Sequence, residues 1–148
     1  MAKIWEVIDN CIPQMRRLVM GITPAGKGAT RFEPQKARTD DDEMVELERG
    51  FRVFSKGEAP EVIEWGAATR GYNVSMIIAI GYSKAEEMNH YAQSDFDSIS
   101  YALQNADSSE VDGLQFYYVP EKSIEWEIEK DFRFMNINVL ARVAATPN

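Results

Sequence analysis

The sequence predicts an α+β fold, with an antiparallel or mixed sheet, an N-terminal helix and one long helix packed on one face of the sheet. Two neighbouring stretches carry this prediction. Between Tyr72 and Tyr82 every second residue is large and apolar, which is the period of a strand with one face against a core. From Ala85 to Ala106 apolar residues recur three, four or seven positions apart, which indicates one stripe of an amphipathic helix. We expect the strand face and the helix stripe to pack on each other in a two-layer arrangement.

Ser83 lies between these two stretches and has the spacing of a helix N-cap. Its hydroxyl can accept a hydrogen bond from the backbone N–H three residues on, and Glu86 at that position can reach back. We therefore expect the long helix to begin directly after the strand.

An N-terminal helix is expected over Ile4–Met20, where apolar residues recur at helical spacing. Pro13 lies inside this helix and removes one backbone hydrogen bond while clashing with the previous turn, which costs roughly 3 kcal/mol. We expect a kink or a restart of the helix near Cys11 to Pro13. Periodicity then disappears over residues 21–49, where Gly and Pro residues indicate a loop that contains a short strand near Arg31 to Glu33.

The other strands follow from shorter patterns. Gly50–Ser55 is strand-like and is followed by a loop through Pro60 and Gly66, and 114–119 is a further strand. From Ser123 onward apolar residues alternate with Glu125, Glu127 and Glu129, which predicts a half-buried strand with an acidic outer face. Phe134 continues that phase, whereas the apolar residues from Met135 to Val143 occupy odd positions. We expect a bulge or a turn at this change of phase.

Composition limits the classes of protein that the chain can belong to. With 148 residues, 45% of them hydrophobic and 11% aromatic, it fits one domain over residues 1–148. Sixteen Lys and Arg against 24 Asp and Glu give a net charge of −8, which argues against tight, sequence-independent binding of nucleic acid. Cys11 is the only cysteine, so the fold does not depend on an intrachain disulfide. No apolar run approaches the ~20 residues needed to span a bilayer, and the N-terminus does not resemble a secretory signal. We expect a soluble, cytoplasmic product without a membrane partner.

Patterns for catalysis, cofactors or metals are absent from the sequence. We find neither a nucleophile elbow, nor a phosphate-binding Gly-rich loop with Lys, nor paired metal ligands. His90 is the only histidine and lies in the predicted long helix without an obvious partner, and Cys11 on an apolar helix face is better explained as a core residue than as a nucleophile. We predict no enzyme activity, no cofactor and no metal site.

Two acidic groups have a functional and a structural interpretation. The cluster Asp40, Asp41, Asp42 and Glu43 could hold a cation, but it lacks the Gly and the spaced ligands of a calcium loop, so a solvated acidic loop explains it better. The row Glu125, Glu127 and Glu129 could suggest carboxylate catalysis, but like charges along one side of a strand are usually its solvated face.

The long loop over residues 21–49 is the strongest candidate interaction site. Its charge is divided, with basic residues first and acidic residues after them. The candidate contact residues are Lys27, Arg31, Lys36, Arg38, Asp40, Asp41 and Asp42. A patch that is basic on one side and acidic on the other suits a head-to-tail contact between identical subunits, which can close into a ring. The alternative is that both charged runs are independently solvated.

The order of elements resembles that of the tail terminator proteins of long-tailed bacteriophages. The resemblance covers nearly the whole chain. It rests on the N-terminal helix, the long loop, the strand around Arg49-Gly-Phe-Arg-Val-Phe54, the strand 73–82, the helix 85–106 and the final strand 134–144. It is a likeness of size, order and pattern, and related neck and tail-completion proteins share the same general design.

This resemblance implies a structural protein of the virion, made in the host cytoplasm and located at the junction of head and tail. Such proteins form a ring, usually hexameric, that caps the head-proximal end of the tail tube, ends tail polymerisation and joins the tail to the head. The implied partners are other copies of the chain, the tail tube protein and the head-tail connector protein. DNA passes through the ring without specific binding, and an acidic lining would let it slide. On this resemblance we assign Glu125, Glu127 and Glu129 to the lumen or to a ring face, and the charged residues of the long loop to contacts with other subunits or with the tube.

Three alternatives remain from the sequence. The first is another neck or connector protein of the same particle. The second is a cytoplasmic protein-binding adaptor, which would recognise a peptide or protein through an exposed sheet edge. The third is a small acidic enzyme, which would need a pocket where His90 or the glutamate row meets other polar groups.

Overall fold

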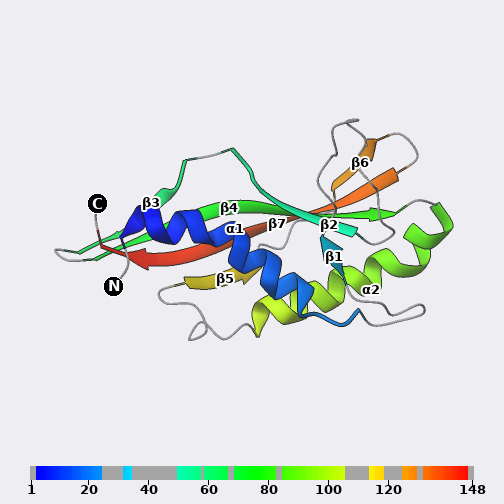
Figure 1. Ribbon diagram of the computed structural model, residues 1–148, viewed down its shortest axis with the longest axis horizontal. Coiled ribbons are helices and arrows are strands. Elements are labelled where there is room, and N and C mark those ends of the chain that lie inside the picture. The colour runs from blue at the N-terminus through cyan, green and yellow to red at the C-terminus, as the bar shows by residue number, and fades with distance from the viewer. Residues whose placement is uncertain are drawn as a thin grey trace.

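The computed structural model describes residues 3–24, 32–34, 50–57, 59–66, 69–82, 85–105, 114–118, 125–129 and 132–146. The elements in chain order are α1 (Ile4–Met20), β1 (Glu33–Pro34), β2 (Gly50–Ser55), β3 (Glu61–Trp65), β4 (Arg70–Tyr82), α2 (Ala85–Gln104), β5 (Leu114–Tyr118), β6 (Glu125–Glu129) and β7 (Phe132–Ala145). The predicted α+β fold class is confirmed (Figure 1). Within the described ranges, neither helix combines the length and the apolar character needed to cross a membrane.

Two long antiparallel strands, β4 and β7, form the centre of the sheet. They pair without interruption from Arg70 opposite Ala145 to Tyr82 opposite Arg133. On the other side of β4, β3 pairs with its N-terminal part and β2 with its C-terminal half. On the other side of β7, β6 pairs with its N-terminal part and β5 with its C-terminal half. The short β1 runs parallel to β2, so the sheet is mixed.

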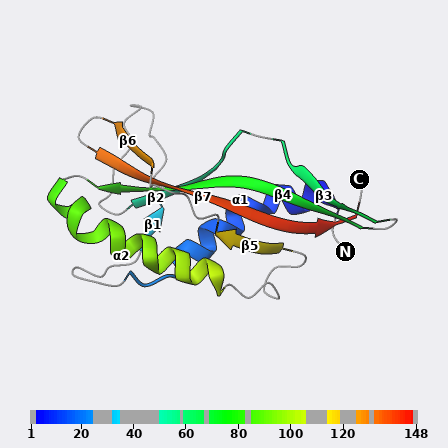
Figure 2. The same ribbon diagram turned by 180° about the vertical axis from the view of Figure 1, so that it is seen from behind.

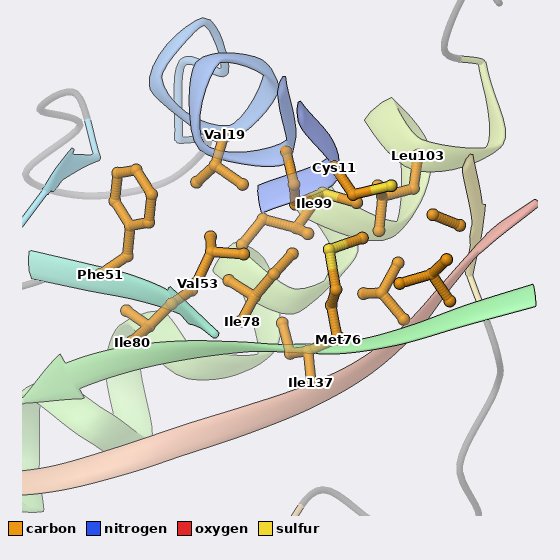
Figure 3. Close-up of a cluster of buried hydrophobic side chains, with 14 of the residues drawn as sticks. Cys11, Val19, Phe51, Val53, Met76, Ile78, Ile80, Ile99, Leu103 and Ile137 are labelled. Carbon is orange, nitrogen blue, oxygen red and sulfur yellow. The ribbon is translucent and has the colours of Figure 1, made fainter. Parts of the chain in front are cut away.

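One face of this sheet carries the hydrophobic core. In β4 the even-numbered residues are buried there, as the sequence predicted, and in β7 the odd-numbered residues from Met135 lie beside them. Figure 3 shows side chains of both helices, including Cys11 and Leu103, directed toward Met76 and Ile78 of β4. Both helices lie on the same side of the sheet (Figures 1 and 2).

The helix α1 continues through Pro13, so the expected restart near Cys11 does not occur. Pro13 is exposed, which places its ring on the solvent side, while Cys11 and Met15 on either side of it are fully buried. Burial of a core side chain stabilises by ~1.5–3 kcal/mol, so a few such residues offset the roughly 3 kcal/mol that the proline costs. The prediction that Cys11 belongs to the core is confirmed, and the buried stripe is completed by Val7 and Val19.

Part of the loop expected between residues 55 and 72 is in fact a strand, β3. It pairs antiparallel with the beginning of β4, where Glu61 lies opposite Asn73 and Val62 lies opposite Tyr72. The register shifts between Val62 and Glu64. This irregularity breaks the two-residue alternation that identifies a strand in a sequence, and the two glutamates reduce its apolar character further.

The bulge expected between Phe134 and Met135 is also absent. Pairing between β4 and β7 is continuous through both residues. Phe134 and Met135 are 1% and 0% exposed and lie on opposite faces of β7, so both faces of the strand are buried at this point. The antiparallel strand β6 ends at Glu129, before this point, and Lys130 and Asp131 between β6 and β7 lie outside the described residues.

Candidate functional site

The helix-free face of the sheet is the face opposite the core. It is formed by the odd-numbered residues of β4 and the even-numbered residues of β7, together with two residues of β2 that pair with Ala79 and Ile77. In the part of the chain that the structure describes, no helix lies on it (Figures 1 and 2). Its described side chains are Arg52, Phe54, Asn73, Ser75, Ile77, Ala79, Phe134, Asn136, Asn138, Leu140, Arg142 and Ala144.

A cation–π contact fixes the position of Arg52 on this face. The guanidinium carbon of Arg52 lies 4.6 Å from the centre of the Phe134 ring. The two residues belong to strands on either side of β4, and the residue of β4 opposite Arg52 is Ala79, which is 1% exposed. A small side chain at this position lets the arginine reach across the central strand, and a partly buried contact of this kind contributes roughly 0.5–2 kcal/mol. A positive charge is thereby held over the helix-free face.

The predicted acidic row lies in the edge strand β6. Glu125, Glu127 and Glu129 are paired with Asn136, Phe134 and Phe132 of β7, so all three occupy register positions of the helix-free face. Trp126 and Ile128 occupy positions of the core face, as the alternation predicted. The structure therefore brings the three glutamates together at one edge of the sheet.

A further acidic residue, Glu61 of β3, occupies a register position of the helix-free face. It is exposed and lies opposite Asn73, an odd-numbered residue of β4. The sequence does not reveal this position, because the segment that forms β3 reads as a loop.

The candidate contacts of the long loop lie outside the described residues, namely Lys27, Arg31, Lys36, Arg38, Asp40, Asp41 and Asp42. The short segment between Arg31 and Lys36 is described in part. Phe32 is buried in the core, and β1 follows it at the edge of β2, with Pro34 opposite Phe51.

A buried hydrogen bond joins β4 to α2. The hydroxyl of Tyr82 donates to Oδ2 of Asp95 at 2.7 Å, and both residues are 0% exposed. Asp95 was not singled out from the sequence, although a signal exists. It falls on the apolar stripe of α2, three residues after Ala92 and four before Ile99, where a charged residue needs a buried partner.

The groups that could support catalysis are few among the described residues. Burial raises the pKa of the Cys11 thiol from 9.0 to about 12, so this group is the neutral thiol at physiological pH. His90 lies in α2, as predicted, but its side chain is outside the described part. Over the described ranges, no three His, Cys, Asp or Glu residues are grouped so that they could hold a metal ion.

No protein-family model, curated protein or solved structure matches the chain. The helix-free face and the two edges of the sheet are therefore interpreted from their own geometry and charge.

Proposed function

We propose that the chain is a structural virion protein that forms a ring on the head-proximal end of a phage tail tube. In this role it ends tail polymerisation and joins the tail to the head, at the head-tail junction of the particle. The proposal rests on the resemblance in element order described above. The structural observation that supports it most is the one-sided architecture: a helical layer covers one face of the sheet and leaves a long face without helices.

This architecture suits a subunit of a closed ring. A ring subunit needs a rigid body and two different surfaces that contact its neighbours. The continuous β4–β7 pairing over thirteen residues of β4 supplies the rigid body, and the sheet has two edges of different sequence. The helix-free face then lines the lumen or a ring face, and its acidic positions repel the phosphates of DNA passing through.

Deletion of the gene from the phage that encodes the chain tests the proposal. We expect filled heads and tails that fail to join, with tails of irregular length because polymerisation no longer stops. Supplying the wild-type chain in trans should restore infectious particles. Normal particle yield from the deleted phage would refute the proposed function.

The two groups of charged residues have separate tests within this function. Reversing the charge of Lys27, Arg31, Lys36 and Arg38 should weaken assembly and leave the monomer folded. Replacing Glu125, Glu127 and Glu129 by Lys should reduce the yield of infectious particles. If that variant assembles normally and only DNA ejection slows, the glutamates line the lumen; if assembly itself fails, they belong to a ring face.

Another neck protein is the nearest alternative, and the deletion separates it from a terminator. Tails of normal length that remain unjoined would indicate a neck layer. An adaptor is favoured by one observation: within the described residues, the outer edges of β3 and β5 pair with no strand. Such an edge can bind an extended peptide. Absence of the chain from purified virions would favour this adaptor function.

A further inference from the structure

We infer that the outer side of α1 binds α1 of a second copy of the chain, as an antiparallel helix pair with two-fold symmetry. The contact surface is one stripe of the helix, which we call the outer stripe and which consists of Trp5, Asp9, Ile12, Arg16 and Met20. The inference does not depend on the proposed function. A two-fold contact joins two copies only and is not the head-to-tail contact that closes a ring.

The outer stripe lies on the surface of the molecule. Its residues follow one another at spacings of four, three, four and four positions, so they share one side of the helix. At roughly 100° per residue, the centre of the outer stripe lies roughly 120° around the helix from the centre of the buried stripe. Trp5 is 54% exposed and Met20 is 43% exposed. They are two of the four large hydrophobic side chains that are exposed among the described residues.

The chemistry of the outer stripe is self-complementary. In an antiparallel pair centred on the stripe, position 5 of one copy lies opposite position 20 of the other, and position 9 lies opposite position 16. Trp5 then packs on Met20, and an aromatic ring and a thioether attract each other. Asp9 lies against Arg16, which allows a charge-assisted hydrogen bond. Because the pair is symmetric, each of these contacts forms twice.

The two charges of the outer stripe have no counterpart within α1. Ion pairs on the surface of one helix join residues three or four positions apart. The residues at these distances from Asp9 and from Arg16 carry no opposite charge, and both side chains are exposed. A parallel pair in register would place Asp9 against its own copy, which is repulsive. An antiparallel second copy therefore supplies the opposite charge that the helix itself lacks.

The centre of the contact is apolar. Ile12 is partly buried against the core, and the exposed Pro13 follows it in the helix. The two-fold axis of the antiparallel pair passes between these two positions, so each residue meets the other one of the second copy. Apolar side chains thus lie between the two ion pairs.

The size of the contact makes it weak. From Trp5 to Met20 the helix rises roughly 22 Å, and a helix with its side chains is roughly 10 Å wide. Such a contact covers far less than the roughly 800 Å² per partner of a stable complex. We expect a dissociation constant of about 0.1 mM, so the dimer forms only in concentrated solution or where copies are held close together.

Sedimentation equilibrium of charge-swapped chains tests the inference, at concentrations up to about 1 mM. Asp9→Arg alone faces Arg16 of the other copy, and Arg16→Asp alone faces Asp9. Each chain should dimerise at least about 10-fold more weakly than the wild type, because like charges meet at both ends of the contact. An equal mixture of the two chains should dimerise like the wild type, since an acidic residue again faces a basic one. The double variant should do the same.

Matched controls carry the same substitutions at exposed positions outside the outer stripe. Arg17→Asp changes α1 at a side chain directed roughly 100° away from Arg16, and Asp97→Arg changes α2. Both control chains should dimerise like the wild type. A thermal melt of each chain shows whether it is folded, and recovery in the mixture excludes misfolding as the cause of a lost dimer.

Disulfide formation gives an independent readout of the orientation, whether or not the chain also forms rings. A mixture of Trp5→Cys and Met20→Cys chains should form a linked dimer, because these positions face each other. Neither chain alone should do so, because its two copies of the new thiol lie roughly 22 Å apart. Cys11 is 0% exposed and does not take part.

Three results would overturn the inference. The first is a wild-type chain that stays monomeric at about 1 mM. The second is undiminished dimerisation of both single charge variants, or a mixture of them that fails to recover it. The third is a mixture of the two cysteine chains that yields no linked dimer. None of these results touches the proposed function, which the gene deletion tests.

Discussion

Replacing Tyr82 by Phe tests the buried contact between β4 and α2. The hydroxyl of Tyr82 donates to Asp95 at 2.7 Å, and both residues are 0% exposed. Phe keeps the aromatic ring, so the substitution opens no cavity of consequence and removes only the donor. Asp95 is then left with one hydrogen bond fewer in a site that water does not reach. Loss of a donor to a buried acceptor costs about 1–3 kcal/mol in the free energy of unfolding.

Urea denaturation followed by circular dichroism measures this loss. For a chain of this size each kcal/mol corresponds to a fall of about 2–4 °C in Tm, which gives a second measure. The matched control is Tyr101→Phe on α2, because Tyr101 is 71% exposed and its hydroxyl is not needed in the interior. We expect the control to lie within about 0.5 kcal/mol of the wild type. If Tyr82→Phe is as stable as Tyr101→Phe, the hydrogen bond does not hold β4 and α2 together as described.

Three further predictions concern the core and the helix-free face. Met76→Asp places a carboxylate at a position that is fully buried among apolar side chains, so it should abolish cooperative unfolding; a melt near the wild-type Tm would contradict this. In the unfolded chain the Cys11 thiol has its ordinary pKa of 9.0, whereas burial raises its pKa in the folded protein to about 12. The free energy of unfolding should therefore not depend on this thiol below pH 9, and it should fall by ~1.4 kcal/mol per pH unit above pH 9. Urea midpoints of Cys11→Ala across this range should lack that fall, and an equal fall in both chains would refute the assignment. Ala79→Leu should block the path of Arg52 across β4 and cost about 1–3 kcal/mol, measured by urea denaturation, and an unchanged midpoint would show that the path is not needed.

The long helices and strands could be predicted from the sequence because each buries one regular face against the core, and this burial alone sets the spacing of its apolar residues. In β4 alternation follows from a single core face, and in α2 the apolar stripe follows from packing against the sheet. These patterns extend over many residues, so one exception does not hide them. The same reasoning identified α1 and β2, and it placed Cys11 in the core.

The predictions for β3, Phe134 and Pro13 failed because in each case a second physical effect hides the simple sequence pattern. The irregular register of β3 removes the alternation that would reveal a strand. The apolar Phe134 next to Met135 looks like a change of phase in the sequence, whereas in the structure Phe134 lies on the helix-free face with the guanidinium of Arg52 over its ring. The expected restart at Pro13 is wrong because the buried residues on either side of it hold α1 together as one helix.

The sequence predicts which charged residues share one side of a strand, but it does not predict how the strands that carry them are ordered in the sheet. Alternation in the sequence placed the three glutamates of β6 on one side of a strand, and pairing with β7 shows that this side is the helix-free face. The positions of β1 and β6 on opposite sides of the β4–β7 pair could not be predicted, because strand order depends on contacts between distant segments. Asp95 lacked a recognisable partner in the sequence because Tyr82 belongs to a different element.

Immunogold electron microscopy of the virus particles tests the central claim most directly, with an antibody shown to bind the native chain. The proposed function predicts gold confined to the junction between head and tail. Label along the tail or on the capsid would contradict the proposed position. Particles without label would exclude a virion role and return the chain to the adaptor class.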